Sequence, residues 1–152
     1  MNPSRHALAA ALLAATALAG ARAEAQVAVS DAWARATVRQ QRSTGAFMQL
    51  RAARDSRLVA ARSPVADTVE VHEMALRDGI MRMRQVSAVE LPAGQPVALS
   101  PGGCHVMLMG LHAQVKEGDT LPLVLVFEDR DGRREAVEVR ATVRALGAGA
   151  PH

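Results

Sequence analysis

Short hydrophobic segments separated by turn residues run through the chain from residue 26 onward. Apolar and polar residues alternate in several of them, for example around Val69 and Val71 and again around Val137 and Val139. A period of two is typical of strands that bury one face. The pattern predicts strands over residues 27–37, 45–50, 57–61, 68–76, 80–86, 97–99, 105–111, 121–127 and 135–145.

Turn-forming residues fall between these segments. They are Ser63-Pro64, Asp78-Gly79, Pro92-Ala93-Gly94, Pro101-Gly102-Gly103, Glu117-Gly118-Asp119 and Asp131-Gly132. Many short strands divided by such turns predict an all-β sandwich or barrel. Residues 52–61 would also suit a helix, because they are rich in Ala and Arg.

Asp78-Gly79 has the composition of a tight hairpin turn, since both residues accept positive φ at lower cost than most. A two-residue loop there places Met74 opposite Met83 and Leu76 opposite Met81.

The first 23 residues have the features of an export signal. Arg5 supplies a positive charge, residues 7–20 form an apolar stretch, and Ala21-Arg22-Ala23 has the form of a cleavage site. The apolar stretch is too short to span a bilayer, so we expect a cleaved signal peptide over residues 1–23, with cleavage after Ala25 as an equal choice. The alternative is a buried N-terminal helix.

The predicted signal peptide determines where we expect the mature protein to begin. We expect one domain over residues 26–146 and a flexible tail over residues 147–152, in a monomer located in the periplasm. Because no Cys lies near the cleavage site, we expect no lipid anchor there and no stable insertion into the membrane.

Composition narrows the classes of function. Aromatic residues make up only 2% of the chain, which counts against nucleic-acid and sugar binding because both rely on stacking. The chain carries 18 basic and 15 acidic residues, and loss of Arg5 and Arg22 with the signal leaves 16 against 15. A net charge near +1 gives no reason to expect a nucleic-acid partner.

Histidine and methionine gather in two clusters. The first holds His72, Met74, Met81 and Met83, and the second holds His105, Met107 and Met109. Positions i and i+2 share one face of a strand, so each cluster presents imidazole and thioether together. The hairpin register also brings Met83 diagonally within reach of His72. No carboxylate is expected within the cluster from its spacing, and Glu73 faces the other side of its strand.

This combination of ligands points to Cu(I). Thioether sulfur is soft and neutral, suits Cu(I), and suits Zn²⁺, Mg²⁺ or Ca²⁺ poorly. Alternatively, the methionines fill a core that is poor in aromatics, as we expect of Met48. Met81 and Met109 would also suit that role.

Four of these residues follow one another at a characteristic spacing: ten residues separate His72 from Met83, twenty-one separate Met83 from His105, and one separates His105 from Met107. This spacing resembles the signature of the periplasmic copper chaperones of the PCu(A)C type. The resemblance spans residues 26–145. Its further blocks are Asp31-Ala32-Trp33-Ala34-Arg35-Ala36, Gly45-Ala46-Phe47-Met48, Val71-His72-Glu73-Met74, Leu91-Pro92-Ala93-Gly94, Pro101-Gly102-Gly103, residues 105–111 and Glu117-Gly118-Asp119-Thr120.

The resemblance implies a cupredoxin-like Greek-key β-sandwich that binds one Cu(I) ion through His72, Met83, His105 and Met107. It also implies that the copper passes to cytochrome c oxidase, directly or through a Sco-type protein. Met74 falls outside this set of four and is expected to line the path to it. The tail carries only His152 as a candidate ligand, so we expect no second site there.

Three other functions compete with this one. A blue-copper electron carrier needs a Cys thiolate at the metal, but Cys104 neighbours His105 and should face the opposite side of the strand. An interaction domain without metal would use the methionines as filler. No catalytic motif of a hydrolase, metalloprotease or phosphate-binding enzyme is present in the sequence, so we expect no enzyme activity.

Overall fold

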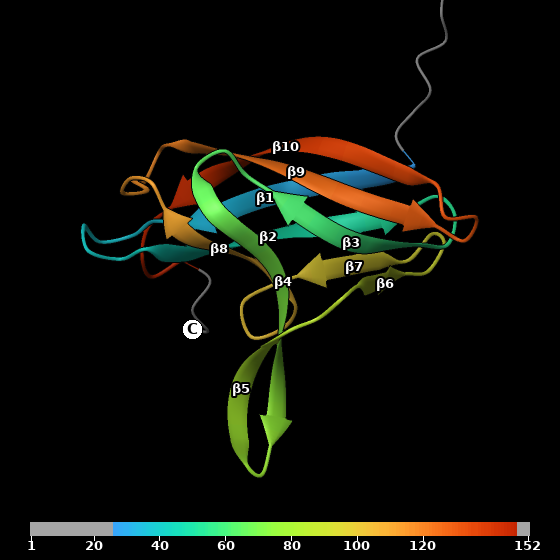
Figure 1. Cartoon of the computed structure of the whole chain (residues 1–152), viewed down its shortest axis with the longest axis horizontal. Coiled ribbons are helices and arrows are strands. Elements are labelled where there is room, and N and C mark those ends of the chain that lie inside the picture. The colour runs from blue at the N-terminus through green and yellow to red at the C-terminus, as the bar shows by residue number, and fades with distance from the viewer. Residues whose placement is uncertain (1–25, 149–152) are drawn as a thin grey trace, which may run out of the picture.

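Ten β-strands and no helix make up residues 26–148, the part of the chain that the computed structural model describes (Figure 1). The strands are β1 (Val27–Arg35), β2 (Ser43–Ala52), β3 (Ser56–Arg62), β4 (Ala66–Arg77), β5 (Ile80–Gln85), β6 (Val89–Leu91), β7 (Pro96–Leu99), β8 (His105–Leu111), β9 (Thr120–Asp129) and β10 (Arg134–Arg144). A search of these residues for a helix that could span a membrane found none. The expectations for the signal peptide and for residues 149–152 lie outside the described residues.

The all-β prediction is confirmed, and each predicted strand is present with bounds that differ by at most two residues. The helix considered for residues 52–61 is wrong, because β2 ends at Ala52 and β3 begins at Ser56. The pattern missed β6, which has only three residues and pairs with the start of β3.

The strands follow one hydrogen-bonded path, in the order β5-β4-β8-β2-β1-β10-β9-β3-β6, with β7 paired to β2. The path curls over so that β3 lies against β4, which closes a sandwich around one core. Leucine, valine and alanine dominate that core, with Met48 and Phe127 among its largest fully buried side chains. Met48 therefore fills the core, as the sequence predicted.

The β4–β5 hairpin projects from this sandwich (Figure 1). Its turn has positive φ at both Asp78 (51°) and Gly79 (74°), which is the backbone of the predicted two-residue loop. The register is also as predicted, with Met74 opposite Met83 and Leu76 opposite Met81.

His72 lies where β4 changes its pairing. Residues of β4 from Ala66 to His72 pair with β8 inside the sandwich, and residues from His72 onward pair with β5 in the hairpin. His72 is therefore the last position at which β4 is joined to the sandwich by its ladder with β8.

Candidate metal centre

The junction of sandwich and hairpin brings both predicted clusters together. His72 on β4 is paired directly with His105 on β8, and their ring centroids lie 6.0 Å apart. Met107 follows His105 on the same face of β8 and is paired with Glu70. Met83 reaches the junction from β5, through its pairing with Met74.

A cavity of about 770 Å³ opens at this junction. Met83, His105 and Met107 line it, together with Met74. His72 is not a lining residue, although its ring lies beside that of His105. Exposure changes steeply across the group, since His105 is only 5% exposed whereas Met83 is 49% exposed. The candidate ligands thus run from the protein interior out to solvent.

The two nitrogens of the His72 ring have different surroundings. Nε2 lies 2.7 Å from a carboxylate oxygen of Glu70, whereas Nδ1 is buried and has no hydrogen-bond partner among the described residues. A carboxylate can only accept, so Nε2 carries the hydrogen and Nδ1 keeps a free lone pair. A buried, unpaired imidazole nitrogen is suited to a metal ligand. The expectation that no carboxylate belongs to the cluster was wrong, because Glu70 lies two residues before His72 on the same face.

The ring of His105 is held in the complementary way. Its Nδ1 lies 3.1 Å from the carbonyl oxygen of Gly103 and donates to it, which leaves the lone pair on Nε2. Burial lowers the pKa of His105 below its ordinary value, against the opposing effect of the Gly103 carbonyl; the nearby His72 and Arg35 lower it further. In each ring the nitrogen that donates to the protein carries the hydrogen, which leaves the lone pair of the other nitrogen for a metal ion, as metal binding requires.

Two aromatic rings support the buried side of the cavity. The Phe47 ring lines it with its centroid 6.0 Å from that of His105, and the Trp33 ring lies 4.5 Å behind Phe47. Gly45 makes room for Phe47, because a Cβ atom on Gly45 would lie 2.9 Å from the end of that ring. Neither Phe47 nor Trp33 was predicted at the site from the sequence. The signal was present, since two of the three aromatic residues in the chain lie here.

The remaining candidates lie outside the cavity lining. Met109 pairs with Ser43 and Thr68, farther along β8. Cys104 packs partly buried against the core, and burial, with the nearby Glu73 carboxylate, raises the pKa of its thiol. A thiol in these surroundings is not activated as a thiolate ligand.

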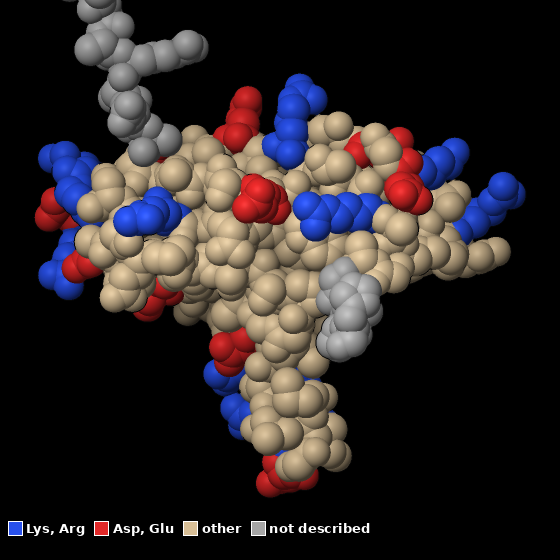
Figure 2. All heavy atoms as spheres, turned by 180° about the vertical axis from the view of Figure 1, so that it is seen from behind, with Lys and Arg blue, Asp and Glu red and all other residues tan. Residues whose placement is uncertain are grey.

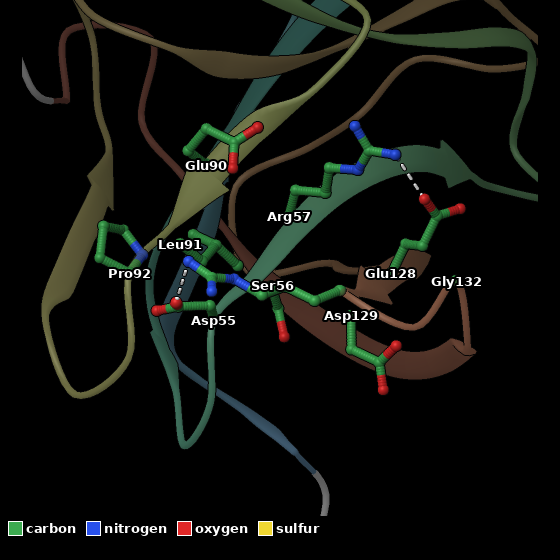
Figure 3. Close-up of a pocket in the computed structure, with 10 residues that line it drawn as sticks. Asp55, Ser56, Arg57, Glu90, Leu91, Pro92, Glu128, Asp129 and Gly132 are labelled. Atoms are coloured by element: carbon green, nitrogen blue, oxygen red, sulfur yellow. Dashed lines mark hydrogen bonds and ion pairs between the residues drawn. The ribbon is translucent and has the colours of Figure 1, made fainter.

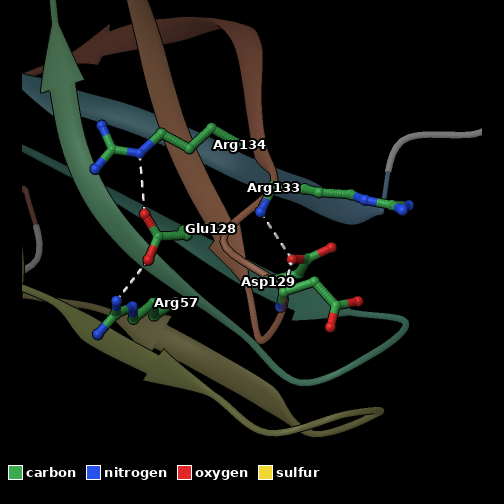
Figure 4. Close-up of polar contacts among 6 residues, drawn as sticks. Arg57, Glu128, Asp129, Arg133 and Arg134 are labelled. Atoms are coloured by element: carbon green, nitrogen blue, oxygen red, sulfur yellow. Dashed lines mark hydrogen bonds and ion pairs between the residues drawn. The ribbon is translucent and has the colours of Figure 1, made fainter.

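A second cavity, of about 410 Å³, lies at β3, β6 and β9, near the other end of the strand order (Figure 3). Its charged groups bond to one another: Glu128 accepts from Arg57 and Arg134, which lowers its pKa (Figure 4). Asp55 is paired with Arg130 in the same way. This ion-pair network joins neighbouring strands and the turn before β10, so we assign it a structural role.

Comparison with other proteins agrees with this architecture. The family described as "Putative lipoprotein LpqE-like" matches residues 27–143. "Putative lipoprotein Lxx21020" of Leifsonia xyli subsp. xyli (strain CTCB07) is 31% identical over 115 residues, which cover 75% of this chain and 69% of that relative.

Solved structures of PCuAC domains share the fold. The copper-bound PCuAC domain from PmoF2 superposes with a TM-score of 0.63 at 25% identity, over 80% of this chain and 94% of that one. Apo-DR1885 from Deinococcus radiodurans gives a TM-score of 0.59 at 31% identity, over 95% of this chain and 97% of that one. Its CuI form gives 0.56 at 33% identity, over 80% and 83% of the two chains. The chain therefore belongs to the LpqE-like family, and its cupredoxin-like sandwich confirms the resemblance to PCuAC domains that the sequence predicted.

Proposed function

We propose that this protein is a copper chaperone that carries one Cu(I) ion and passes it to an acceptor protein. The proposed ligands are His72, Met83, His105 and Met107. The observation that carries the proposal is the direct pairing of His72 with His105 beside a cavity lined by the two methionines. Each imidazole has one nitrogen bonded to the protein and a lone pair on the other.

The ligand types favour Cu(I) over harder ions. Two neutral imidazoles and two thioethers add no negative charge, so they suit a soft monovalent ion and stabilise a divalent one poorly. Among residues 26–148, no group of three His, Cys, Asp or Glu side chains is placed to hold a metal. A site built only from the ligands that Zn²⁺ prefers is therefore not formed in that part of the chain.

Exposure supports a carrier rather than a permanent metal site. Met83 is half exposed and lies on the projecting hairpin, where a ligand from another protein can reach the ion. A copper-bound PCuAC domain and CuI-DR1885 are among the solved relatives, which supports Cu(I) as the cargo here. The proposed acceptor is the copper centre of cytochrome c oxidase, reached directly or through a Sco-type protein.

The proposed location is the periplasm. The features of residues 1–23 support export, and the names "Putative lipoprotein LpqE-like" and "Putative lipoprotein Lxx21020" agree with a protein outside the cytoplasm. Thioether ligands suit such a compartment because they resist oxidation better than thiols do.

The ligand assignment is tested by anaerobic titration of Cu(I) against a chromophoric chelator, bathocuproine disulfonate. Met83→Leu and Met107→Leu keep the volume nearly constant, so each should cost less than about 1.5 kcal/mol of stability. Each removes one of four ligands, so the Cu(I) affinity should fall by about tenfold or more. Unchanged affinity in both variants would refute the assignment.

Met48→Leu is the matched control, because Met48 is buried in the core and is not a lining residue of the cavity. It should leave the Cu(I) affinity unchanged. Delivery is tested separately, by mixing the loaded protein with a Sco-type protein or with the copper-binding domain of the oxidase. If copper stays on the chaperone in both mixtures, the proposed delivery is wrong while Cu(I) binding stands.

A further inference from the structure

The two faces of the β4–β5 hairpin differ in chemistry. Met74 and Leu76 on β4 face Met83 and Met81 on β5, so one face carries three thioethers and a leucine. The opposite face carries the charged residues Glu73, Arg77, Arg82 and Arg84. Figure 2 shows charged side chains gathered along one side of the projecting hairpin and an uncharged surface on the other.

The thioether face is not part of the core. Met81 is 51% exposed and Leu76 is 67% exposed, so the suggestion that Met81 fills the core was wrong. Core packing explains Met48 but gives no reason for sulfur at position 81, where leucine would serve equally well. An exposed thioether is useful to a soft metal ion, which binds sulfur and not a hydrocarbon side chain.

These sulfur atoms form a series that leads away from the cavity. Met83 and Met74 line the cavity and face each other across the hairpin, and Met81 is the next residue on the Met83 face toward the turn. Met81 is therefore diagonal to Met74, a separation that long side chains can bridge. Met83 belongs to both the proposed four-ligand centre and this outer group.

We propose that Met74, Met81 and Met83 form an outer Cu(I) position on the hairpin, through which the ion enters and leaves the four-ligand centre. The inference rests on the proposed function, and it assigns a new role to Met74 and Met81. An ion that leaves the centre stays bound to Met83 while Met74 and Met81 replace the histidines and Met107. No electron or proton is transferred, since Cu(I) exchanges one neutral ligand for another.

Charge keeps this outer position weak. Its three thioethers are neutral, and the other face of the same hairpin has three arginines against one glutamate, with Arg84 paired to Glu73. Nearby positive charge disfavours a cation, so the ion does not accumulate on the hairpin. A weak intermediate position lowers the barrier between centre and solvent without competing for the ion at equilibrium.

Detailed balance gives a sharp test. If a residue binds the ion only in transit, its substitution must change the loading rate and the removal rate by the same factor and leave the dissociation constant unchanged. We therefore expect Met81→Leu, in the full mature chain, to slow both rates by about threefold to tenfold. Stopped-flow absorbance measures Cu(I) removal by excess bathocuproine disulfonate and loading from its Cu(I) complex.

Two further variants separate sulfur from shape. Leu76→Met adds a thioether beside Met81 and should accelerate both rates, whereas Ile80→Leu alters an exposed apolar residue on the charged face and should change neither. Unchanged rates in Met81→Leu would overturn the proposal, and so would an equal slowing in Ile80→Leu. A weakened affinity in Met81→Leu would overturn it as well, because Met81 would then be an equilibrium ligand. Failure of the four-ligand centre itself would appear separately, as unchanged Cu(I) affinity in both Met83→Leu and Met107→Leu.

Discussion

Replacing Glu70 should weaken Cu(I) binding although Glu70 is not one of the proposed ligands. Its carboxylate accepts a hydrogen bond from Nε2 of His72 and so leaves the lone pair on the buried Nδ1. A partner of this kind orients the ring and raises the basicity of the ligating nitrogen. Glu70→Gln keeps an acceptor but loses the charge, and Glu70→Leu loses both.

The structure sets the size of the effect. The bond is 2.7 Å long, and the side chains of His72 and Glu70 are 13% and 28% exposed, so water screens it only in part. A hydrogen bond to a charged group contributes about 1.5–3 kcal/mol, and one between neutral groups about 0.5–1.5 kcal/mol. The bond is already present in the metal-free protein, so this difference of about 1–1.5 kcal/mol is an upper bound on the loss, and Glu70→Gln should weaken Cu(I) binding by up to about tenfold. Glu70→Leu should approach the upper end of the 10–100-fold range that is usual for such partners.

Chelator competition under anaerobic conditions measures these affinities. Glu73→Gln is the control, because Glu73 lies on the same strand, faces the other side and is paired with Arg84. Like Glu70→Gln, it removes one negative charge close to His72 in the chain. It should leave the Cu(I) affinity close to that of the wild type. The predicted order of affinity is wild type, then Glu70→Gln, then Glu70→Leu.

Two results would refute this reasoning. Equal loss of affinity in Glu73→Gln and Glu70→Gln would mean that general electrostatics, not the bond to His72, is responsible. Nitrogen chemical shifts of the metal-free protein provide the second test, since they show which nitrogen of His72 carries the hydrogen. A hydrogen on Nδ1 would contradict the proposed role of Glu70.

Two more predictions concern the buried side of the site. Burial lowers the pKa of His105 in the folded state, so between that lowered value and the ordinary value of 6.5 the unfolded chain binds more protons. The free energy of unfolding of the metal-free domain should therefore fall as the pH drops through this window. Urea unfolding should show a smaller fall in His105→Gln than in the wild type. The same pH dependence in both proteins would contradict this prediction. Gly45→Ala places a methyl group 2.9 Å from the Phe47 ring, and should cost about 1–3 kcal/mol by urea unfolding. Because that ring lies against His105, Cu(I) affinity should fall as well, and a variant with wild-type stability and affinity would show that Phe47 moves aside freely.

Local chemistry explains what could be predicted from the sequence. The turn at Asp78-Gly79 sets the hairpin register from two adjacent residues, so the pairing of Met74 with Met83 follows without knowledge of the rest of the fold. Alternation along β8 likewise separates His105 and Met107 from Val106, which is fully buried. Both features depend on residues close together in the chain.

Contacts between distant strands could not be predicted in this way. No local pattern reports that β4 lies beside β8, so the direct pairing of His72 with His105 was not predicted, although the family resemblance implied that both bind the same ion. The short β6 forms because β3 provides a partner strand, not because of its own pattern. Glu70, by contrast, follows from the local pattern, because the period of two places it on the face of His72, whereas Glu73 lies on the opposite face.

The site joins two regions that differ in local stability. His105 lies on β8, which is hydrogen-bonded on both sides by β2 and β4, whereas Met83 lies on β5, whose ladder is with β4 alone at the edge of the sheet. A two-stranded segment without a core opens at much lower free energy than a central strand. We therefore expect the buried histidine to fix where the ion binds and the hairpin to control how readily the ion is released. Because Met83 is both the most exposed proposed ligand and the one on the less stable segment, we expect the ion to leave the centre still bound to Met83, while the ligands on the sandwich are exchanged first.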